Sequence, residues 1–377
     1  MTRVLHVIGA MDRGGAETMI MNLYRSIDRD KLQFDFLVHE ERECDYDAEI
    51  GRLGGKIYRL PRFTGSNLVK YRSLCRRFFD EHPEYPIVHG HIGSSAAIYL
   101  SAAREAGRRA VAHSHSQNYT KGLGGLAFSI ASYPTRFVAD WFFACSEEAG
   151  IARFGSRVVR GERFAVLDNG IDLERYRCDE SLHRAAKESF GLERRPVFGH
   201  VGRLDPEKNH AFLLEAFASL RHDLPDAVLL LAGRGCLEED LKRQAQELGI
   251  ESSARFLGVV DDVPALLRAV DVFAFPSVNE GLAMAAVEAQ ASGAQCLISD
   301  GVPKRAFISE DTVRLPLDAG SEAWASEMWR LYERSKEGER VDRVDEARAC
   351  GFDVVQTAAR LQRFYGRLAD EGRRARF

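Results

Sequence analysis

Several marks of metal-scaffolded, disulfide-bonded and membrane-spanning proteins are missing from the 377-residue sequence. Its seven cysteines are scattered and form no Cys-x-x-Cys pair, so no zinc or iron–sulfur framework is predicted, and scattered thiols favour a reducing compartment. No run of about 18 uninterrupted apolar residues occurs, which argues against a transmembrane helix. The first residues enter an apolar run directly, so we expect no signal peptide. These absences predict a cytoplasmic protein.

The sequence also lacks an excess of charge of either sign. Lysine and arginine total 52, and aspartate and glutamate total 56, which gives a net charge of -4. A dedicated nucleic-acid-binding protein usually carries a basic excess, so that class is disfavoured. With 45% hydrophobic and 29% charged residues the composition is that of an ordinary folded protein, and the length predicts about two domains.

Short apolar runs alternate with helical patterns along almost the whole chain. An alternation of this kind indicates βαβ units and parallel sheets. The predicted strands are Val4–Ile8, Phe34–Val38, Lys56–Arg59, Ile87–His89, Ala110–Ala112, Trp141–Cys145 and Arg163–Leu167, followed by Val197–Val201, Ala227–Ala232, Ala254–Leu257, Val272–Phe275, Gln295–Ile298 and Thr312–Leu315.

The βαβ rhythm pauses over residues 168–195, where turn residues precede a strongly charged stretch. We place the domain boundary there, which gives an N-terminal domain over 1–172, a linker over 173–195 and a C-terminal domain over 196–351. Residues 352–377 predict a last helix that packs back on the N-terminal domain. The predicted fold class is α/β, with two doubly wound domains facing each other across a cleft. Ligands of such sheets bind beyond the carboxyl ends of the strands, so functional residues are expected in the loops that follow strands.

Two glycines precede the first predicted helix. Gly14 and Gly15 follow the first strand and come directly before the helical pattern over 16–27. Paired glycines at a helix N-terminus let backbone N–H groups approach a phosphate, and the helix dipole favours its negative charge. The spacing matches neither a dinucleotide fingerprint nor a P-loop, so phosphate contact and a plain tight turn both remain open.

A basic pair lies in the first loop of the second domain. Arg203 and Lys208 follow the strand over 197–201 and precede a helix over 210–220. Arginine offers a forked donor and lysine a point charge, a combination that suits a diphosphate. A solvated surface loop is the alternative.

Two glutamates flank and enter a small, apolar helix. Glu280 lies just before this helix, and Glu288 lies about two turns into it. A carboxylate among alanines is costly unless it is hydrogen-bonded, and sugar and ribose hydroxyls are suitable donors. The alternative is a pair of capping or ion-paired glutamates, which the alanine-rich surroundings disfavour.

Two His-x-His pairs close predicted strands. One pair is His89 and His91, and the other is His113 and His115. A lone histidine is usually structural, but two pairs at strand ends indicate a site. Metal binding is disfavoured because no acidic or cysteine partner has metal-site spacing, so we predict no metal.

Three further motifs are misleading. Gly233-Arg234-Gly235 follows a strand but lacks the third glycine of a dinucleotide fingerprint, which argues against a nicotinamide dehydrogenase. The acidic pairs Asp28-Arg29-Asp30 and Asp45-Tyr46-Asp47 match a metal-binding D-x-D pattern, but they lie in very polar stretches that indicate surface turns.

Taken together, these motifs resemble the family 4 retaining glycosyltransferases of the GT-B fold, and the opening stretch resembles their exopolysaccharide, EpsF-like branch. The resemblance covers almost the whole chain. The motifs that carry it occur in the expected order: Gly14-Gly15-Ala16-Glu17, Asn169-Gly170-Ile171-Asp172, Gly202-Arg203-Leu204 with Lys208, and the segment from Glu280 to Glu288.

The resemblance implies a role for each matching position of the second domain. Arg203 and Lys208 would bind the donor diphosphate. Glu280, with Gly281 and Leu282, would contact the transferred sugar, and Glu288 the ribose hydroxyls.

It also implies roles in the N-terminal domain. Gly14 and Gly15 would face the diphosphate through their amides, and Asn169 would lie at the hinge. The active-site histidine of the family corresponds to His115, with His113 as the alternative because the alignment can slip by two residues.

Two departures from the family pattern concern the donor sugar. Ala294-Gln295 replaces the usual Leu-Pro pair, and Leu282 replaces a frequent aromatic residue. We expect both to lie near the donor sugar pocket and to affect which sugar is used.

The resemblance predicts a metal-independent, retaining glycosyltransferase without a cofactor. It would transfer a sugar from a nucleoside-diphosphate sugar to a glycan or polyprenyl-diphosphate-linked acceptor in exopolysaccharide or capsule synthesis. Alternatives are another GT-B enzyme, such as a sugar-nucleotide epimerase or a phosphorylase, and a catalytically inactive assembly partner.

A lipid-linked acceptor predicts peripheral contact with the inner face of the cytoplasmic membrane through the N-terminal domain. One feature is the apolar stretch over 123–130, flanked by Lys121 and Arg136. The others are two arginine-rich helical patches, both of which could instead be a solvated face over a buried core. Their residues are Arg72, Arg76 and Arg77 with Phe78 and Phe79, and Arg104, Arg108 and Arg109.

Overall fold

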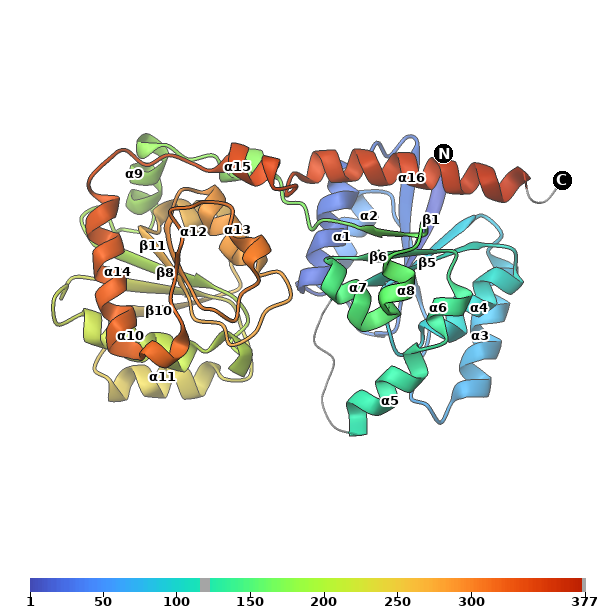
Figure 1. Cartoon of the computed structure of the whole chain (residues 1–377), viewed down its shortest axis with the longest axis horizontal. Coiled ribbons are helices and arrows are strands. Elements are labelled where there is room, and N and C mark those ends of the chain that lie inside the picture. The colour runs from blue at the N-terminus through green and yellow to red at the C-terminus, as the bar shows by residue number, and fades with distance from the viewer. Residues whose placement is uncertain (116–122, 375–377) are drawn as a thin grey trace. The chain divides into compact units, whose positions relative to one another are not determined.

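Parallel strands organise both halves of the chain. The structure is a computed structural model and describes residues 1–115 and 123–374. Two units are present: unit 1 comprises Met1–Ile171 and Gly351–Phe377, and unit 2 comprises Asp172–Cys350 (Figure 1). Ser116 and Lys121 lie outside the described residues.

Unit 1 contains a seven-stranded parallel sheet with the order β3-β2-β1-β4-β5-β6-β7. Its strands are β1 (Thr2–Ile8), β2 (Leu32–Val38), β3 (Ile57–Arg59), β4 (Ile87–Gly90), β5 (Arg109–Ser114), β6 (Trp141–Ala144) and β7 (Phe164–Val166). Its helices are α1 (Gly15–Ser26), α2 (Asp47–Arg52), α3 (Leu68–Glu81), α4 (Ala96–Glu105), α5 (Leu123–Ser132), α6 (Thr135–Val138), α7 (Glu147–Phe154), α8 (Ser156–Val159) and α16 (Val354–Arg374).

The two faces of this sheet bury different helices because side chains alternate along each strand. Val4 and Ile8 of β1 belong to a core that includes residues of α1 and α16. Leu5 and Val7, on the opposite face, pack with residues of α3 and α4. Since β1 is central and apolar on both faces, it fixes the position of the loop that follows it.

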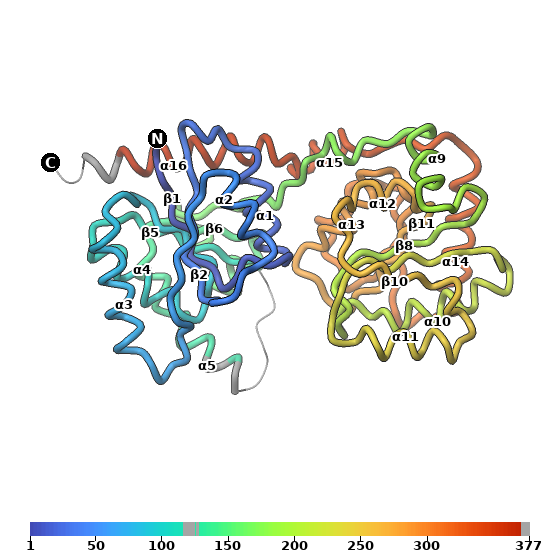
Figure 2. Tube along the Cα trace, turned by 180° about the vertical axis from the view of Figure 1, so that it is seen from behind, coloured from blue at the N-terminus to red at the C-terminus, as the bar shows by residue number. Residues whose placement is uncertain are grey.

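The last helix returns to unit 1, as the sequence predicts. The backbone N–H of Ile171 donates to the Phe352 carbonyl at 2.8 Å, and α16 begins two residues later and packs on α1 (Figure 2). Gly170 is required at this crossing, because a Cβ there would lie 2.5 Å from the Cα of Val354. Tyr365 on α16 is fully buried.

Unit 2 contains a six-stranded parallel sheet with the order β10-β9-β8-β11-β12-β13. Its strands are β8 (Val197–Val201), β9 (Val228–Ala232), β10 (Ala254–Gly258), β11 (Val272–Phe275), β12 (Gln295–Ile298) and β13 (Val313–Arg314). Its helices are α9 (Glu180–Ser189), α10 (His210–Leu220), α11 (Glu238–Glu247), α12 (Val263–Ala269), α13 (Met284–Ala291), α14 (Ser321–Ser335) and α15 (Val344–Ala349), with the 3-10 turns η1 (Leu173–Tyr176), η2 (Pro206–Lys208), η3 (Lys304–Ala306) and η4 (Leu317–Ala319). Helices α10, α11 and α14 bury their apolar sides in one core with the sheet.

The segment predicted as a linker, 173–195, is structured and belongs to unit 2. It forms η1 and α9, and α9 packs on α12. Lys187 of α9 donates to Asp271 at 2.9 Å, and both side chains are buried. The high charge that suggested a linker therefore includes a buried ion pair.

Among the described helices, none combines the length and apolar character required to cross a membrane.

Candidate functional site

A lysine–glutamate pair lies at the carboxyl edge of the unit 2 sheet. Lys208 ends η2, after β8, and its Nζ donates to Oε1 of Glu280 at 2.5 Å. Their side chains are only 18% and 11% exposed, and the ammonium also lies 5.0 Å from the centre of the Phe275 ring. The structure therefore brings together two predicted donor-binding residues that are 72 positions apart.

Arg203 is held less firmly. Its guanidinium is 71% exposed and pairs with Asp205 at 3.1 Å. The Asp205 side chain also accepts from the backbone N–H of Lys208, which caps the short η2 turn. Arg203 is therefore available to bind a charged ligand at little desolvation cost.

Glu288 occupies a drier environment on α13. Burial raises the pKa of its carboxyl to about 7. A hydrogen bond from Tyr176 and the positive charge of Arg175 act in the opposite direction and lower this pKa. A group whose pKa lies near neutral pH and whose charge is stabilised by partners is typical of a binding site. Gly281 and the buried Leu282 precede the same helix.

The glycines of the misleading Gly233-Arg234-Gly235 motif support the Arg203 loop. A Cβ on Gly233 would lie 1.9 Å from the Gly202 carbonyl oxygen, and one on Gly235 would lie 2.2 Å from that of Leu204. Leu204 donates its backbone N–H to Arg234 at 3.0 Å. The glycine spacing therefore serves close backbone packing beneath the basic loop.

Two strained residues precede the helices that point at this edge. Asn209, before α10, has φ of 57°, and Ala283, before α13, has φ of 59°. No other non-glycine residue in the described ranges has a positive φ. An alanine in this region costs about 1–2 kcal/mol, and such strain clusters at functional sites. Sequence reasoning missed this feature because nothing in the residue type of Ala283 indicates it.

In unit 1, Gly14 is the N-cap of α1 and Gly15 its first residue. No side chain caps this helix end, and a Cβ on Gly15 would meet no atom within 4 Å. The Gly14 N–H donates to the Asp12 carbonyl at 2.8 Å, and a Cβ on Gly14 would lie 2.3 Å from a carboxylate oxygen of Glu17, so the start of α1 already has a carboxylate beside it. Asn169 is buried, and its Oδ1 has no hydrogen-bond partner among the described residues.

Five histidines lie on one face of the unit 1 sheet: His6, His89, His91, His113 and His115. Strands β1, β4 and β5 are adjacent, and His6 lies directly opposite His89. His6 Nδ1 lies 2.9 Å from His91 Nε2, and His91 Nδ1 lies 2.7 Å from His115 Nε2. His115, the first choice for the active-site histidine, thus belongs to a hydrogen-bonded row with His91 and His6, and His6 was not singled out from the sequence.

Burial favours the neutral form of these imidazoles. Burial lowers the pKa of His6 to about 3 and of His115 to about 4, and it lowers the pKa of His89, His91 and His113 well below the ordinary value. His113 is 5% exposed, and neither ring nitrogen has a partner among the described residues. His115 follows β5 and is only partly buried, with its Nδ1 unpartnered in the described part of the chain.

The same rings form two groups in which ring nitrogens lie close to one another. One ring nitrogen from each of His6, His89 and His91 lies within 4.8 Å of the other two, and His91, His113 and His115 form a second such group. The chain spacing gave no indication of a metal site, because strand pairing and not sequence proximity brings these residues together.

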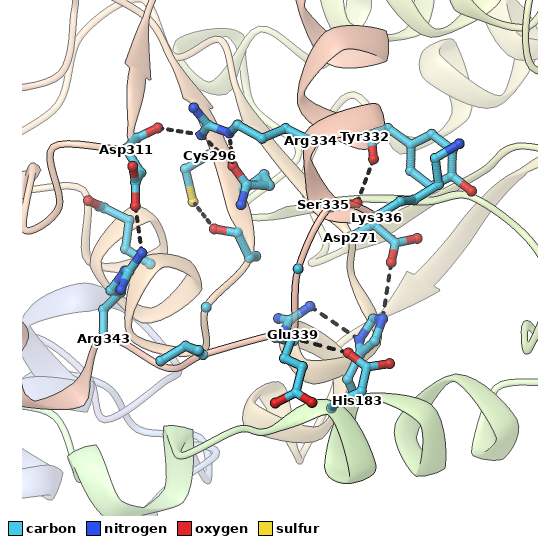
Figure 3. Close-up of a pocket in the computed structure, with 18 of the residues that line it drawn as sticks. His183, Asp271, Cys296, Asp311, Tyr332, Arg334, Ser335, Lys336, Glu339 and Arg343 are labelled. Carbon is cyan, nitrogen blue, oxygen red and sulfur yellow. Dashed lines mark hydrogen bonds and ion pairs between the residues drawn. The ribbon is translucent and has the colours of Figure 1, made fainter.

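A cavity of about 620 Å³ lies at the opposite, amino edge of the unit 2 sheet (Figure 3). Gln295, at the start of β12, lines it and accepts from Arg334. The expectation that Ala294-Gln295 lies near the donor sugar is therefore wrong, because β12 carries this pair to the end of the sheet away from Lys208. Arg343 pairs with Asp311 at 2.5 Å, so the charges here are engaged with one another.

The predicted basic–aromatic patch on α3 is also wrong in part. Phe78 and Phe79 are buried in the core. Arg72 and Arg76 both pair with Glu105. Helical periodicity turns the aromatic residues inward and leaves Arg72 and Arg76 at the surface, where they share one carboxylate.

The carboxyl edge of unit 2 combines two cations with two acidic hydrogen-bond acceptors. Such a set can hold a diphosphate through Arg203 and Lys208 and hydroxyl groups through Glu280 and Glu288. Stabilising the charge that develops on a departing diphosphate is the chemistry that this arrangement favours.

Comparison with known proteins agrees with this chemistry. Residues 13–175 match Glycosyltransferase Family 4, and residues 183–348 match Glycosyl transferases group 1. A protein of Bacillus subtilis (strain 168) that is named "Putative glycosyltransferase EpsF" is 35% identical to this chain over 369 residues, which cover 96% of each chain. A UDP-Gal:alpha-D-GlcNAc-diphosphoundecaprenol alpha-1,3-galactosyltransferase of Escherichia coli is 31% identical over 234 residues, 58% of each chain.

Among solved structures, Anabaena HepE in complex with UDP-glucose superposes with a TM-score of 0.78 at 20% identity, covering 97% of this chain and 100% of that one. This likeness shows the fold, with two parallel-sheet units as predicted. The chain belongs to the family 4 glycosyltransferases, and its fold is GT-B.

Proposed function

We propose that this glycosyltransferase acts with retention of configuration and transfers a sugar from a nucleoside-diphosphate sugar to a glycan or polyprenyl-diphosphate-linked acceptor in exopolysaccharide-type synthesis. The observation that carries the proposal is the Lys208–Glu280 pair at the carboxyl edge of unit 2, with Glu288 on the helix that follows. The E. coli relative is named for a UDP-sugar donor and a diphosphoundecaprenol acceptor, and HepE was crystallised with UDP-glucose, which supports both substrate classes.

Each residue of the edge has a role in this proposal. Lys208 and Arg203 bind the donor diphosphate and stabilise the negative charge that grows on it as the glycosidic bond breaks. The Lys208 ammonium keeps its place between Glu280 and Phe275 and donates a further hydrogen bond to the diphosphate, while Glu280 also accepts hydrogen bonds from the transferred sugar. Glu288 accepts from the ribose hydroxyls.

Unit 1 supplies the other groups. The amide of Gly15, in the first turn of α1, adds a donor for the diphosphate, and Gly14, whose own N–H donates to the Asp12 carbonyl at 2.8 Å, lets the ligand approach it. His115, which follows β5, contacts the reacting sugars, and His113 is the alternative residue for this role. The acceptor attacks from the face that the leaving diphosphate occupies, and a diphosphate oxygen takes the acceptor proton.

Donor binding is tested by a thermal-shift screen with UDP-, GDP- and ADP-sugars, followed by turnover with those that bind. A donor at 100 times its dissociation constant stabilises the protein by about 2.7 kcal/mol. Arg203→Ala is expected to weaken donor binding at least about tenfold, because a charge-assisted hydrogen bond contributes about 1.5–3 kcal/mol. Arg243→Ala, on the exposed side of α11, is the matched control and keeps wild-type affinity.

If no sugar nucleotide shifts the melting temperature and none is turned over, the protein is an inactive GT-B partner. Turnover that inverts a sugar carbon without an acceptor identifies the epimerase alternative instead.

Turnover is expected to need no added divalent metal, because Lys208 and Arg203 supply the positive charge that Mg²⁺ or Mn²⁺ provides in other glycosyltransferases. The measurement compares kcat of EDTA-dialysed enzyme with and without these two ions. Activity that returns only with Mg²⁺ or Mn²⁺ contradicts the proposed role of the cations.

Membrane contact is proposed at the α5–α6 segment. Ile130, Tyr133 and Phe137 are 66%, 52% and 67% exposed, which is unusual for large apolar side chains so close in sequence. Arg136 lies 4.0 Å from the centre of the Tyr133 ring and adds a positive charge to this patch. In Figures 1 and 2, α5 lies at the side of unit 1 away from α16.

At low salt, the protein is expected to co-sediment with anionic vesicles. Changing both Tyr133 and Phe137 to Ser should reduce the co-sedimenting fraction by at least half. Apolar insertion and the nearby arginine both contribute to such binding. Trp329→Ser removes an exposed aromatic from α14 of unit 2 and is expected to change nothing. Equal sedimentation of the double variant and the wild type would rule out this patch as the contact.

A further inference from the structure

The row of histidines contains a group of three that is unusually dry. His6 and His89 are each 1% exposed, and they lie opposite each other on β1 and β4. His91 follows β4 by one residue and points to the same face because side chains alternate along the strand. The ring centres of the three pairs are 4.5–5.2 Å apart.

Two nitrogens of this group are buried without a partner among the described residues: His6 Nε2 and His89 Nε2. Leaving one buried polar atom unpaired costs about 1–3 kcal/mol. An ion bound by His6 Nδ1, His89 Nε2 and His91 Nε2 would satisfy the second of these nitrogens, and imidazole nitrogens are ligands for borderline divalent metals.

The outer nitrogens are already oriented as metal sites require. A metal-bound histidine almost always uses its second ring nitrogen in another hydrogen bond, which fixes the orientation of the ring. His89 Nδ1 lies 2.5 Å from the Tyr365 hydroxyl, and His91 Nδ1 lies 2.7 Å from His115 Nε2. The nitrogens that remain, His89 Nε2 and His91 Nε2, are those that an ion would use.

The spacing is also close to what one ion needs. Two nitrogens bound to a tetrahedral zinc ion at about 2.0–2.1 Å are about 3.3 Å apart. His6 Nδ1 and His91 Nε2 are 2.9 Å apart, and all three rings offer nitrogens within 4.8 Å. To admit the ion, the hydrogen-bonded 2.9 Å contact would open by about half an ångström, and any pair near the 4.8 Å limit would close toward 3.3 Å.

We propose that His6, His89 and His91 bind one borderline divalent transition-metal ion, with Zn²⁺ as the best match to three neutral imidazoles. This trio is preferred over His91, His113 and His115 because His6 and His89 are almost fully buried and because Tyr365 holds the outer nitrogen of His89. The ion would also fix His91 Nδ1 as a donor to His115 and so orient the ring that contacts the sugars. This last consequence rests on the proposed function.

Metal content and affinity test the site without reference to activity. Tag-free, full-length protein is analysed for bound metal by mass spectrometry, dialysed against EDTA and then titrated with Zn²⁺ by calorimetry and with Co²⁺ by visible absorption. We expect one Zn²⁺ per chain, a rise in melting temperature with Zn²⁺ but not with Mg²⁺, and a Co²⁺ spectrum of a nitrogen-rich, low-coordinate site.

Variants identify the ligands. His89→Ala and His91→Ala should each lower Zn²⁺ affinity at least about 100-fold, and Tyr365→Phe, which keeps the packing and removes only the hydroxyl, about tenfold. His222→Ala, at an exposed position after α10, is the surface control and should bind as the wild type does. If the alanine variants fail to fold, Tyr365→Phe alone still decides, since it is expected to fold.

Three results overturn the proposal. One is a chain that carries no metal and shows no melting shift with Zn²⁺, Co²⁺ or Ni²⁺. Another is Tyr365→Phe with wild-type affinity. The third is loss of Zn²⁺ binding in His113→Ala but not in His89→Ala, which would move the site to the second trio. Each of these results can be obtained with a protein that is fully active in sugar transfer. Failure of the metal site can therefore be distinguished from failure of the proposed function.

Discussion

Lys208→Met lowers kcat about 100- to 1,000-fold in sugar transfer. The expected size follows from removing one preorganised charge aimed at a developing anion, which typically costs that much. The ammonium is only 18% exposed and is held by Glu280 and Phe275, so its position is set before the donor binds. Steady-state kinetics with the donor found in the screen measures the loss.

Two companions make this result specific. Lys336→Met removes a lysine at the end of α14 that pairs with Glu333, and kcat should stay at the wild-type value. Glu280→Gln leaves the cation in place and removes the charge of its partner, so donor binding should persist while transfer falls. A Lys208→Met enzyme within threefold of wild type would show that Lys208 does not contact the leaving group.

Glu288→Gln is expected to stabilise the protein at pH 8 and to weaken donor binding at the same time. Burial raises the pKa of Glu288 from 4.5 to about 7 in the folded chain, so the unfolded chain loses this proton at lower pH. The stability that the protonated carboxyl provides is fully present below pH 4.5 and is lost as the pH rises through 7. Above pH 7 the loss is about 3 kcal/mol at most, and glutamine does not incur it.

Denaturant unfolding at pH 5 and pH 8 measures this difference. The free energy of unfolding of the variant, relative to that of the wild type, should be higher at pH 8 than at pH 5. Donor affinity should fall about tenfold or more in the variant, and in the wild type it should decline below pH 7, where the carboxyl gains a proton. Equal pH profiles of donor affinity in the two proteins would show that the ionised Glu288 does not bind the ribose.

Elements defined by local pattern could be predicted from the sequence. All the predicted strands, from Val4–Ile8 to Thr312–Leu315, overlap strands of the structure, because alternating apolar runs and helices leave few other arrangements. The family and the GT-B fold followed from motifs that keep their order along the chain.

Features that depend on contacts between distant segments could not be predicted. The proximity of His6 to His91 depends on the pairing of β1 with β4, and the burial of Phe78 depends on how α3 rotates against the sheet. The place of Gln295 depends on the direction of β12. The positive φ of Ala283 is imposed by the loop around it and leaves no signal in composition.

Helix α16 has a consequence for the order in which the protein is made. Val354, Leu361 and Tyr365 complete the core of unit 1, yet a ribosome adds them only after every residue of unit 2. Domains generally fold as units during synthesis, with the N-terminal one first. Here the first unit must wait, with one face of its sheet incompletely covered, until unit 2 has been synthesised in full. A message that ends early therefore yields a chain whose second half can fold while its first half stays unfinished.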